Sequence, residues 1–212
     1  MEIVYMDEAL IVCVKPAGAL STDEPGGVPD LLRESLGDPH AELRTVHRLD
    51  RVVGGLMALG RSAEAASELS RQIREGSFEK EYLAVVRGET ADGGEMVDLL
   101  VRDRARKMTF VTGESGKGVQ EARLRFETLE RAQGMSLVRI RLLTGRTHQI
   151  RCQFAHRGMP LVGERKYCQA QEDCALALWS CRLAFRHPVT AEKLEFLRSP
   201  PECFPWTSMK KL

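Results

Sequence analysis

Stretches in which apolar and polar residues alternate predict a chain built largely from short strands. A period of two is clear in residues 120–128 and again in residues 137–142, where successive side chains fall on opposite faces. Residues 55–59 are apolar or glycine throughout, which indicates a buried strand. The predicted strands are residues 3–5, 11–14, 55–59, 78–86, 120–128, 137–142, 175–179, 183–185 and 193–197.

Boundary residues predict three helices between these strands. Pro29 suits the first position of a short helix. Ser62 is a candidate N-cap for a second helix, which ends at Gly76. Thr147 is a candidate N-cap for a third helix, which runs to Arg157. Many strands, few helices and several hairpins predict an α+β fold, a single domain with a mixed, largely antiparallel sheet flanked by helices and loops.

The composition is that of an ordinary globular protein. The chain has 212 residues, of which 43% are hydrophobic and 29% charged, so it can bury a core without disulfide cross-links. Its longest uncharged run, residues 52–60, is far shorter than the roughly 20 apolar residues of a membrane helix. Acidic residues stand near the start, where a signal peptide carries basic ones. We therefore expect a cytoplasmic protein with no membrane partner.

The cysteines and histidines do not favour a metal site. None of the six cysteines forms a Cys-x-x-Cys pair, and we expect free, buried thiols. His148, Cys152 and His156 recur at i, i+4 and i+8 of the third predicted helix, a spacing that could place three ligands on one face. A helical stripe also gives this spacing by chance, and a fourth ligand is missing. We expect no bound metal.

The net charge of +1 conceals a local excess of basic residues. It excludes a histone-like binder, because the whole chain has no net field to attract phosphate. Residues 131–166, however, hold eight basic residues and one acid, Glu164. Residues 44–61 hold four arginines around a single carboxylate, Asp50. Arginine grips phosphate bidentately, so these segments favour nucleic-acid binding over an ordinary solvated face.

The residues around Asp50 allow a structural or a catalytic interpretation. Asp50 could form a structural ion pair with its cationic neighbours. Tyr82 lies in a strand, where a tyrosine is most often a core residue with a satisfied hydroxyl. Residues 145–147 open a helix whose free amides suit either simple capping or an anion. Arg151 lies beside Ile150 on that helix and requires a carboxylate partner.

Together these segments resemble the RluA family of pseudouridine synthases. Residues 47–50 (HRLD) are similar to the family signature whose Asp is catalytic. Residues 80–88 (KEYLAVVRG) are similar to its second motif, whose Tyr lies against the target uracil. Residues 143–151 (LTGRTHQIR) are similar to its third, whose last Arg pairs with the catalytic Asp. Further landmarks are Lys15-Pro16-Ala17-Gly18, residues 158–163 and residues 183–188.

The resemblance covers about residues 7–190 and implies one pseudouridine-synthase-like domain, with two local departures. Val53-Gly54 stands where the family usually has Thr-Ser, and Trp179-Ser180 stands where it has His-Ala. Many relatives carry a separate S4 RNA-binding domain at the N-terminus. Only 46 residues precede His47, and strands fill them, so we expect a catalytic domain alone that holds RNA itself.

The resemblance assigns Asp50, Tyr82 and Arg151 as catalytic residues. Pseudouridine formation breaks the uridine N1–C1′ bond and rejoins the base through C5, an exchange without redox change, so no cofactor is expected. Asp50 could attack C1′ or remove the C2′ proton, and the sequence does not choose between these roles. Arg151 would hold Asp50 ionised, and Tyr82 would stack on the uracil.

Other residues are expected to contact structured RNA, either ribosomal or transfer RNA. The target base must leave its stack, and the resemblance gives Arg48 the role of filling the vacated space. Leu178 would keep the site dry, and Arg146 and Thr147 at the helix start would bind backbone phosphate. His47 completes the expected RNA-binding set. We expect a monomer.

Two other classes of function stay open. A non-catalytic RNA-binding or RNA-folding protein could keep the same fold, and the altered Val53-Gly54 stretch is the one feature that favours it. A hydrolase acting on a nucleoside or glycoside would need a second catalytic carboxylate. Besides Asp50, the basic segments offer only Glu164.

Overall fold

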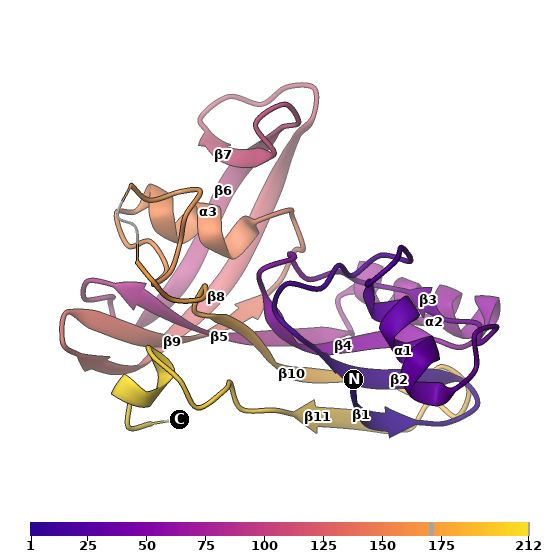
Figure 1. Ribbon diagram of the computed structural model, residues 1–212. Helices are drawn as coiled ribbons and strands as arrows, with labels where there is room; N and C mark the ends of the chain where they lie inside the picture. The colour runs from indigo at the N-terminus through magenta and orange to yellow at the C-terminus, as the bar shows by residue number, and fades with distance from the viewer. Residues whose placement is uncertain (170–171, 212) are drawn as a thin grey trace. The chain divides into compact units, whose positions relative to one another are not determined.

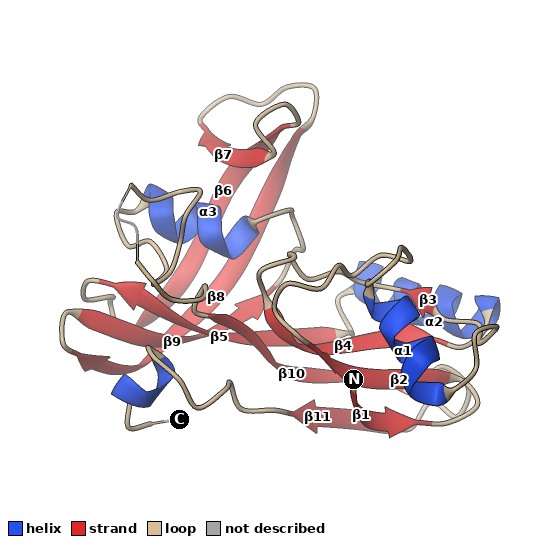
Figure 2. Cartoon of the chain, viewed as in Figure 1, coloured by secondary structure: helices blue, strands red, loops and turns tan. Residues whose placement is uncertain are grey.

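The chain divides into two compact units in a computed structural model that describes residues 1–169 and 172–211. Unit 1 comprises Met1–Lys80 and Trp179–Ser199, and unit 2 comprises Glu81–Leu178 and Pro200–Leu212. Strands dominate both units, with few helices, which confirms the α+β class (Figure 2). A single domain across the whole chain stays a prediction.

Unit 1 is a mixed sheet with a helix on each face. Its strands are β1 (Glu2–Met6), β2 (Leu10–Lys15), β3 (Arg44–Thr45), β4 (Gly54–Gly60), β10 (Leu178–Arg186) and β11 (Lys193–Leu197). They lie in the order β1-β2-β4-β10, with β3 added to β4 and β11 to β10 (Figure 1). Strand β4 is antiparallel to β2 and parallel to β10. Its helices are α1 (Val28–Leu36) and α2 (Ala63–Glu75).

The alternation of side chains along β2 and β4 separates the core of unit 1 into two clusters. Leu10 and Leu56 pack with Leu69 of α2. The next residue of each strand turns to the other face, and there Ile11 packs with Leu32 of α1. All seven residues of β4 are buried, so the strand that follows Asp50 is held from both sides.

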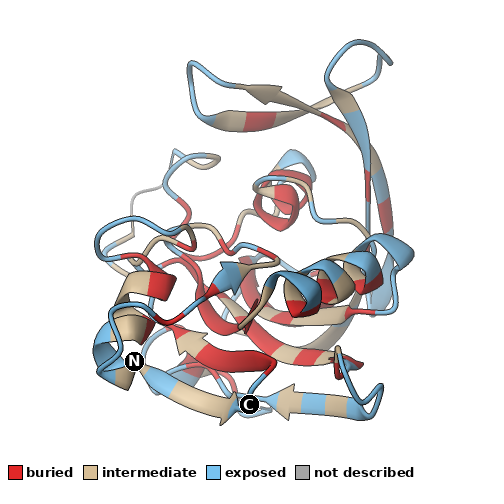
Figure 3. Cartoon of the chain, turned by 90° about the vertical axis from the view of Figure 1, so that its right-hand side faces the viewer, coloured by how far each residue is buried: buried red, intermediate tan, exposed pale blue. Residues whose placement is uncertain are grey.

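Unit 2 is an antiparallel sheet in the order β5-β9-β8-β6-β7. The strands are β5 (Glu79–Arg87), β6 (Gly93–Asp103), β7 (Met108–Thr112), β8 (Val119–Ala132) and β9 (Met135–Leu142). Helix α3 (Gln149–His156) packs on β6 and β8 through Cys152, which lies against Leu100 and Ala122. A short 3-10 helix, η1 (Trp206–Ser208), follows near the C-terminus. The β6–β7 hairpin, at the top of Figure 3, is mostly half-buried or exposed.

The structure adds one element that was not predicted and corrects two local predictions. The β6–β7 hairpin was not predicted, because residues 102–107 are almost all charged and give no alternating pattern. The two strands predicted at residues 175–179 and 183–185 are one strand, β10, which begins only at Leu178 and continues through Ser180, a fully buried residue that pairs with Gly55 of β4. Helix α3 begins one residue later than expected, and its N-cap is His148.

No helix in the described ranges is long and apolar enough to cross a membrane.

Asp7 joins the β1–β2 turn to the turn between β10 and β11. Its carboxylate accepts hydrogen bonds from the Tyr5 hydroxyl at 2.6 Å and from the backbone N–H of Ala9 and Leu10 at 2.8 and 2.9 Å. His187, which is buried, lies 2.8 Å from the same carboxylate. Burial raises the pKa of Asp7, but these hydrogen bonds outweigh burial and lower it to about 2.

Asp7 is therefore expected to make stability depend on pH below the ordinary carboxyl pKa of 3.8. A depressed folded-state pKa contributes stability that is present above pH 3.8 and lost as the pH falls toward 2. The difference in unfolding free energy between the wild type and Asp7→Asn should shrink across that window, measured by urea unfolding at several pH values. A difference that stays constant from pH 5 to pH 2 would contradict this role for Asp7.

Candidate active site

In the segment that carries Asp50, successive side chains alternate between buried and more exposed positions. His47 and Leu49 are buried, Arg48 is exposed and Asp50 is half-buried. A tight turn follows, in which the N–H of Val53 donates to the Asp50 carbonyl at 3.0 Å. Strand β4 begins directly after this turn. The backbone thus presents Arg48 and Asp50 toward solvent from a segment whose alternate side chains anchor it in unit 1.

Lys15, at the end of β2, fixes the chain that leaves Asp50. Its side chain is fully buried, and Nζ donates to the carbonyls of Pro16 and Arg51 at 3.1 Å and of Val53 at 2.7 Å. Burial lowers the pKa of Lys15 to about 8, and the negative charge of Asp50 opposes that shift. The ammonium group therefore holds the turn after Asp50 and is electrostatically attracted to its carboxylate.

Ser21 fixes the chain on the other side of Asp50. Its hydroxyl donates to the Leu49 carbonyl at 2.9 Å and accepts from the Leu49 N–H at 3.0 Å, both buried. The Ser21 carbonyl in turn accepts from the Thr45 hydroxyl at 3.1 Å. Two side chains that are distant in the sequence, Lys15 and Ser21, thus hold the backbone on both sides of Asp50.

His47 is a buried, neutral residue that supports β4. Its Nε2 accepts from the Ala58 N–H at 3.1 Å, which assigns the ring proton to Nδ1, and its ring lies 5.6 Å from that of Phe78. Burial, with the nearby charge of Lys80, lowers the pKa of His47 to about 3. This placement favours a positioning role, and direct RNA contact by His47 stays a prediction.

The two departures from the family pattern meet in space. A Cβ on Gly54 would lie 2.6 Å from Cζ3 of Trp179, so the indole occupies the room that a side chain at position 54 would need. Gly55 has a φ of +117° and abuts the backbone of Ser180, where a Cβ would lie 2.6 Å from its N. The indole of Trp179 therefore fits against the chain only because residue 54 is a glycine.

Unit 2 carries the other expected site residues. Tyr82 is buried in β5, opposite Ile140 of β9, and Leu178 is buried at the start of β10. The backbone of Val85 donates to Ala177 at 3.2 Å and accepts from Val162 at 2.9 Å, which fixes the returning segment before Leu178 on β5.

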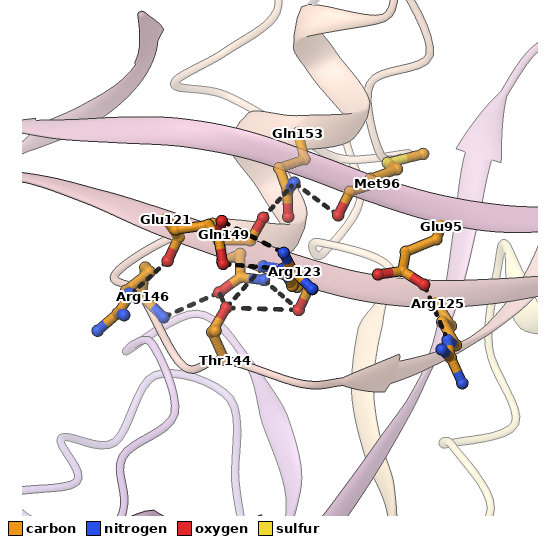
Figure 4. Close-up of polar contacts among 10 residues, drawn as sticks. Glu95, Met96, Glu121, Arg123, Arg125, Thr144, Arg146, Gln149 and Gln153 are labelled. Atoms are coloured by element: carbon orange, nitrogen blue, oxygen red, sulfur yellow. Dashed lines mark hydrogen bonds and ion pairs between the residues drawn. The ribbon is translucent and has the colours of Figure 1, made fainter. Parts of the chain in front are cut away.

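The third motif forms a loop that is held by side chains, shown in Figure 4. Gln149, the first residue of α3, accepts from the Arg146 N–H at 3.0 Å and from the Thr144 hydroxyl at 2.8 Å. Its amide donates to the Arg123 carbonyl of β8 at 3.0 Å. The Gln149 side chain therefore makes the hydrogen bonds that hold this loop. Thr147, which was expected to cap the helix, is exposed.

Arg151 forms a buried bidentate ion pair with Glu164. Its Nε and Nη2 each donate to one carboxylate oxygen of Glu164 at 2.7 Å, and both side chains are almost fully buried. The guanidinium also lies over the Tyr167 ring, 5.6 Å from its centre. Burial raises the pKa of Glu164, but the hydrogen bonds and charge of Arg151 outweigh it and leave that pKa below its usual value. The orientation of Arg151 is thus set by two neighbours.

The structure distributes the expected residues over both units. His47, Arg48 and Asp50 lie together in unit 1. Tyr82, Arg146, Thr147, Arg151 and Leu178 lie in unit 2. The pairing of Asp50 with Arg151 stays a prediction.

Sequence reasoning missed Lys15, Ser21 and Glu164 as supporting residues. Two of the three left a weak signal in the sequence. Lys15 closes an otherwise apolar strand, and Glu164 is the single acid in a strongly basic segment. The His148-Cys152-His156 stripe is accounted for by other contacts, since His148 Nδ1 lies 2.7 Å from the Tyr167 hydroxyl and Cys152 is packed in the core. In the described part of the chain, no three ligand-type side chains cluster to hold a metal ion.

The buried state of His47 predicts a pH-dependent stability. Because its folded-state pKa is about 3 against an ordinary 6.5, the unfolded chain binds the extra proton first as the pH falls. The contribution of His47 should therefore decline below pH 6.5 by about 1.4 kcal/mol per pH unit. Urea unfolding between pH 7 and pH 5 should show a shallower slope for His47→Gln than for the wild type. The exposed His40→Gln is the matched control, and an equal change in both variants would contradict the assignment.

Removing the charge of Glu164 should destabilise the fold. Glu164→Gln leaves the buried Arg151 without this carboxylate, so we expect a loss of about 3 kcal/mol in unfolding free energy, measured by urea denaturation. Glu164→Asp keeps the charge and should lose less. Glu95→Gln removes the exposed pair with Arg125 and should cost under about 1 kcal/mol. Equal losses for Glu164→Gln and Glu95→Gln would show that the buried pair has no special weight.

The sequence matches the RNA pseudouridylate synthase family over residues 9–156. A dual-specificity RNA pseudouridine synthase RluA from Pasteurella multocida is 33% identical over 211 residues, covering 94% of this chain and 93% of the relative. A ribosomal large subunit pseudouridine synthase D from Pseudomonas aeruginosa is 31% identical, covering 97% and 70%. A tRNA pseudouridine synthase C from Yersinia pestis is 29% identical, covering 99% and 89%.

Solved structures confirm the fold. Human RNA pseudouridylate synthase domain containing 1 superposes with a TM-score of 0.81 at 22% identity, covering 95% of this chain and 84% of that one. Human RNA pseudouridylate synthase domain containing 4 gives a TM-score of 0.79 at 20% identity, covering 95% and 89%. With the sequence match, these findings place the chain in the RluA-type RNA pseudouridine synthase family, a family of isomerases that act on RNA.

Proposed function

We propose that the chain isomerises specific uridines of ribosomal or transfer RNA to pseudouridine, with Asp50 as its catalytic carboxylate. The observation that carries the proposal is the anchoring of Asp50, since Lys15 and Ser21 fix the backbone on both sides while the side chain stays half-buried. A carboxylate held in this way can act on a bound sugar without reorganising its own backbone. The names of the relatives, which act on large-subunit or transfer RNA, support the substrate class.

Asp50 acts at the ribose of the target uridine. The bond from N1 to C1′ breaks, the uracil turns, and a bond forms from C5 to C1′. The C5 proton is lost to solvent and N1 takes up a proton, so atoms and electrons balance without a cofactor. Asp50 begins this sequence either by attack on C1′ or by removal of the C2′ proton.

The remaining residues position the base and hold the RNA. Tyr82 stacks on the uracil and assists loss of the C5 proton, while Leu178 keeps water away. Arg151, gripped by Glu164, keeps the catalytic carboxylate ionised. Arg48 is exposed two residues before Asp50, which suits a side chain that fills the space of the flipped base. Arg146 and Thr147 contact backbone phosphate. A monomer in the cytoplasm is the proposed working form.

The release of tritium from RNA labelled at uracil C5 tests the proposal. The wild type should release tritium from ribosomal or transfer RNA, and Asp50→Asn should be slower by at least about 100-fold because the reacting carboxylate is gone. Asp38→Asn, an exposed substitution in the same unit, is the matched control and should keep wild-type activity. Because Asp50 attracts the buried Lys15 ammonium, the folded state of Asp50→Asn is checked by circular dichroism.

The products separate this proposal from the alternatives. Free uracil in the supernatant would indicate a hydrolase. Tight RNA binding by the wild type, without tritium release from any cellular RNA, would indicate an RNA-binding protein and overturn the proposal.

A further inference from the structure

A small hollow lined by several polar side chains lies beside the turn of the β6–β7 hairpin in unit 2. It has a volume of about 50 Å³, which compares with roughly 30 Å³ for one water in the liquid. Its polar lining comes from Arg102 of β6, Thr109 of β7, Gln120 of β8, and Arg146 and Thr147 of the loop before α3. The hollow therefore has room for a small ligand group beside these polar side chains.

Two arginines face this hollow without an acidic partner. Arg102 and Arg146 are both half-buried, and among the described residues neither forms a salt bridge with a carboxylate. Two nearby arginines, by contrast, are paired with acids. Arg106, in the β6–β7 turn, pairs with Asp103, and Arg123, on β8, pairs with Glu121. Positive charge that is partly desolvated and unpaired favours binding of an anion.

The two arginines are held in place by neutral groups. Arg146 donates from Nε to the Glu121 carbonyl at 2.9 Å, which leaves its two terminal nitrogens for another acceptor. Arg102 approaches the Thr109 hydroxyl at 3.4 Å. That hydroxyl donates to the Thr147 carbonyl at 2.9 Å, joining the hairpin to the third motif. The hollow is therefore built by hydrogen bonds before any ligand arrives.

The hydrogen bonds around the hollow continue, through Thr109 and Tyr167, to Arg151. The N–H of Thr109 donates to the Tyr167 hydroxyl at 2.9 Å, and the ring of Tyr167 lies under the guanidinium of Arg151. An anion bound at Arg102 would thus be held on the same hydrogen-bonded framework as Arg151. Phosphate contacts set the position of a nucleic acid on a protein in this way.

We propose that Arg102 and Arg146 together bind one backbone phosphate of the substrate RNA. The proposal rests on the proposed function for its ligand, and it adds the β6–β7 hairpin to the RNA-binding surface. Arginine suits this role because its planar group donates to two phosphate oxygens at once. The contact is made by substrate before and during reaction alike, so its loss weakens binding and leaves the chemical step intact.

The test compares Arg102→Gln with Arg104→Gln, a matched control that removes an exposed charge from the turn of the same hairpin. Arg102→Gln should raise the KM for RNA by about 10-fold at unchanged kcat, as expected for one lost charged hydrogen-bonded contact. Its slope of log affinity against log salt, measured by fluorescence anisotropy, should be shallower by about 0.7 to 0.9. Arg104→Gln should change the salt slope less and leave the KM near that of the wild type.

Further outcomes decide against the proposal. Equal KM and salt slope in Arg102→Gln and the wild type would overturn it. Thermal stabilisation by inorganic phosphate that is lost in Arg102→Gln, with RNA binding unchanged, would also overturn it by assigning the hollow to a free anion. If Arg102→Gln does not fold, Arg102→Lys decides, because it keeps the charge, loses the planar fork and should raise the KM by a smaller factor. If the wild type released no tritium, the proposed catalytic function of Asp50 would fail. The anisotropy measurement would still test whether Arg102 contributes to RNA binding at the hollow.

Discussion

The ammonium group of Lys15 determines the local structure on which the proposed chemistry depends. It donates to three backbone carbonyls at the end of β2 and in the turn after Asp50, where no water is needed to satisfy it. A buried cation is tolerated only when hydrogen bonds and an opposite charge offset its desolvation. Asp50 supplies part of that opposite charge. The carboxylate proposed to react therefore also stabilises the group that fixes its own backbone.

Unit 2 uses the same principle, again with a buried cation offset by a carboxylate. There a buried cation on α3, Arg151, is gripped by the carboxylate of Glu164 and covered by the ring of Tyr167. Tyr167 also receives a hydrogen bond from Thr109 of β7. Each unit thus contains a charged group whose orientation is fixed by several neighbours. Rigid support of this kind is what a site needs when it acts through position and electrostatics.

Much of this arrangement could be predicted from the sequence, because it is local. The HRLD signature singled out Arg48 and Asp50, and both are more exposed than His47 and Leu49 beside them. The strands that alternate clearly were found, and so were the helices with good boundary residues.

The parts that could not be predicted depend on contacts between distant segments. Glu164 and Arg151 are brought together by the loop between them, and the Ser21 hydroxyl meets Leu49 across 28 positions. The β6–β7 hairpin was not predicted because the charged residues 102–107 around its turn give no alternating pattern. The proposed pairing of Asp50 with Arg151 has its origin in the resemblance alone.

The contact between Gly54 and Trp179 makes the residues allowed at these two positions depend on each other. A side chain at position 54 and an indole at position 179 compete for the same space. A serine at position 54 would press its Cβ against the indole unless Trp179 shifts. Overpacking of this kind typically costs about 1–3 kcal/mol. The effects of substitutions at the two positions are therefore expected to be non-additive, with a side chain at 54 tolerated best beside a smaller residue at 179.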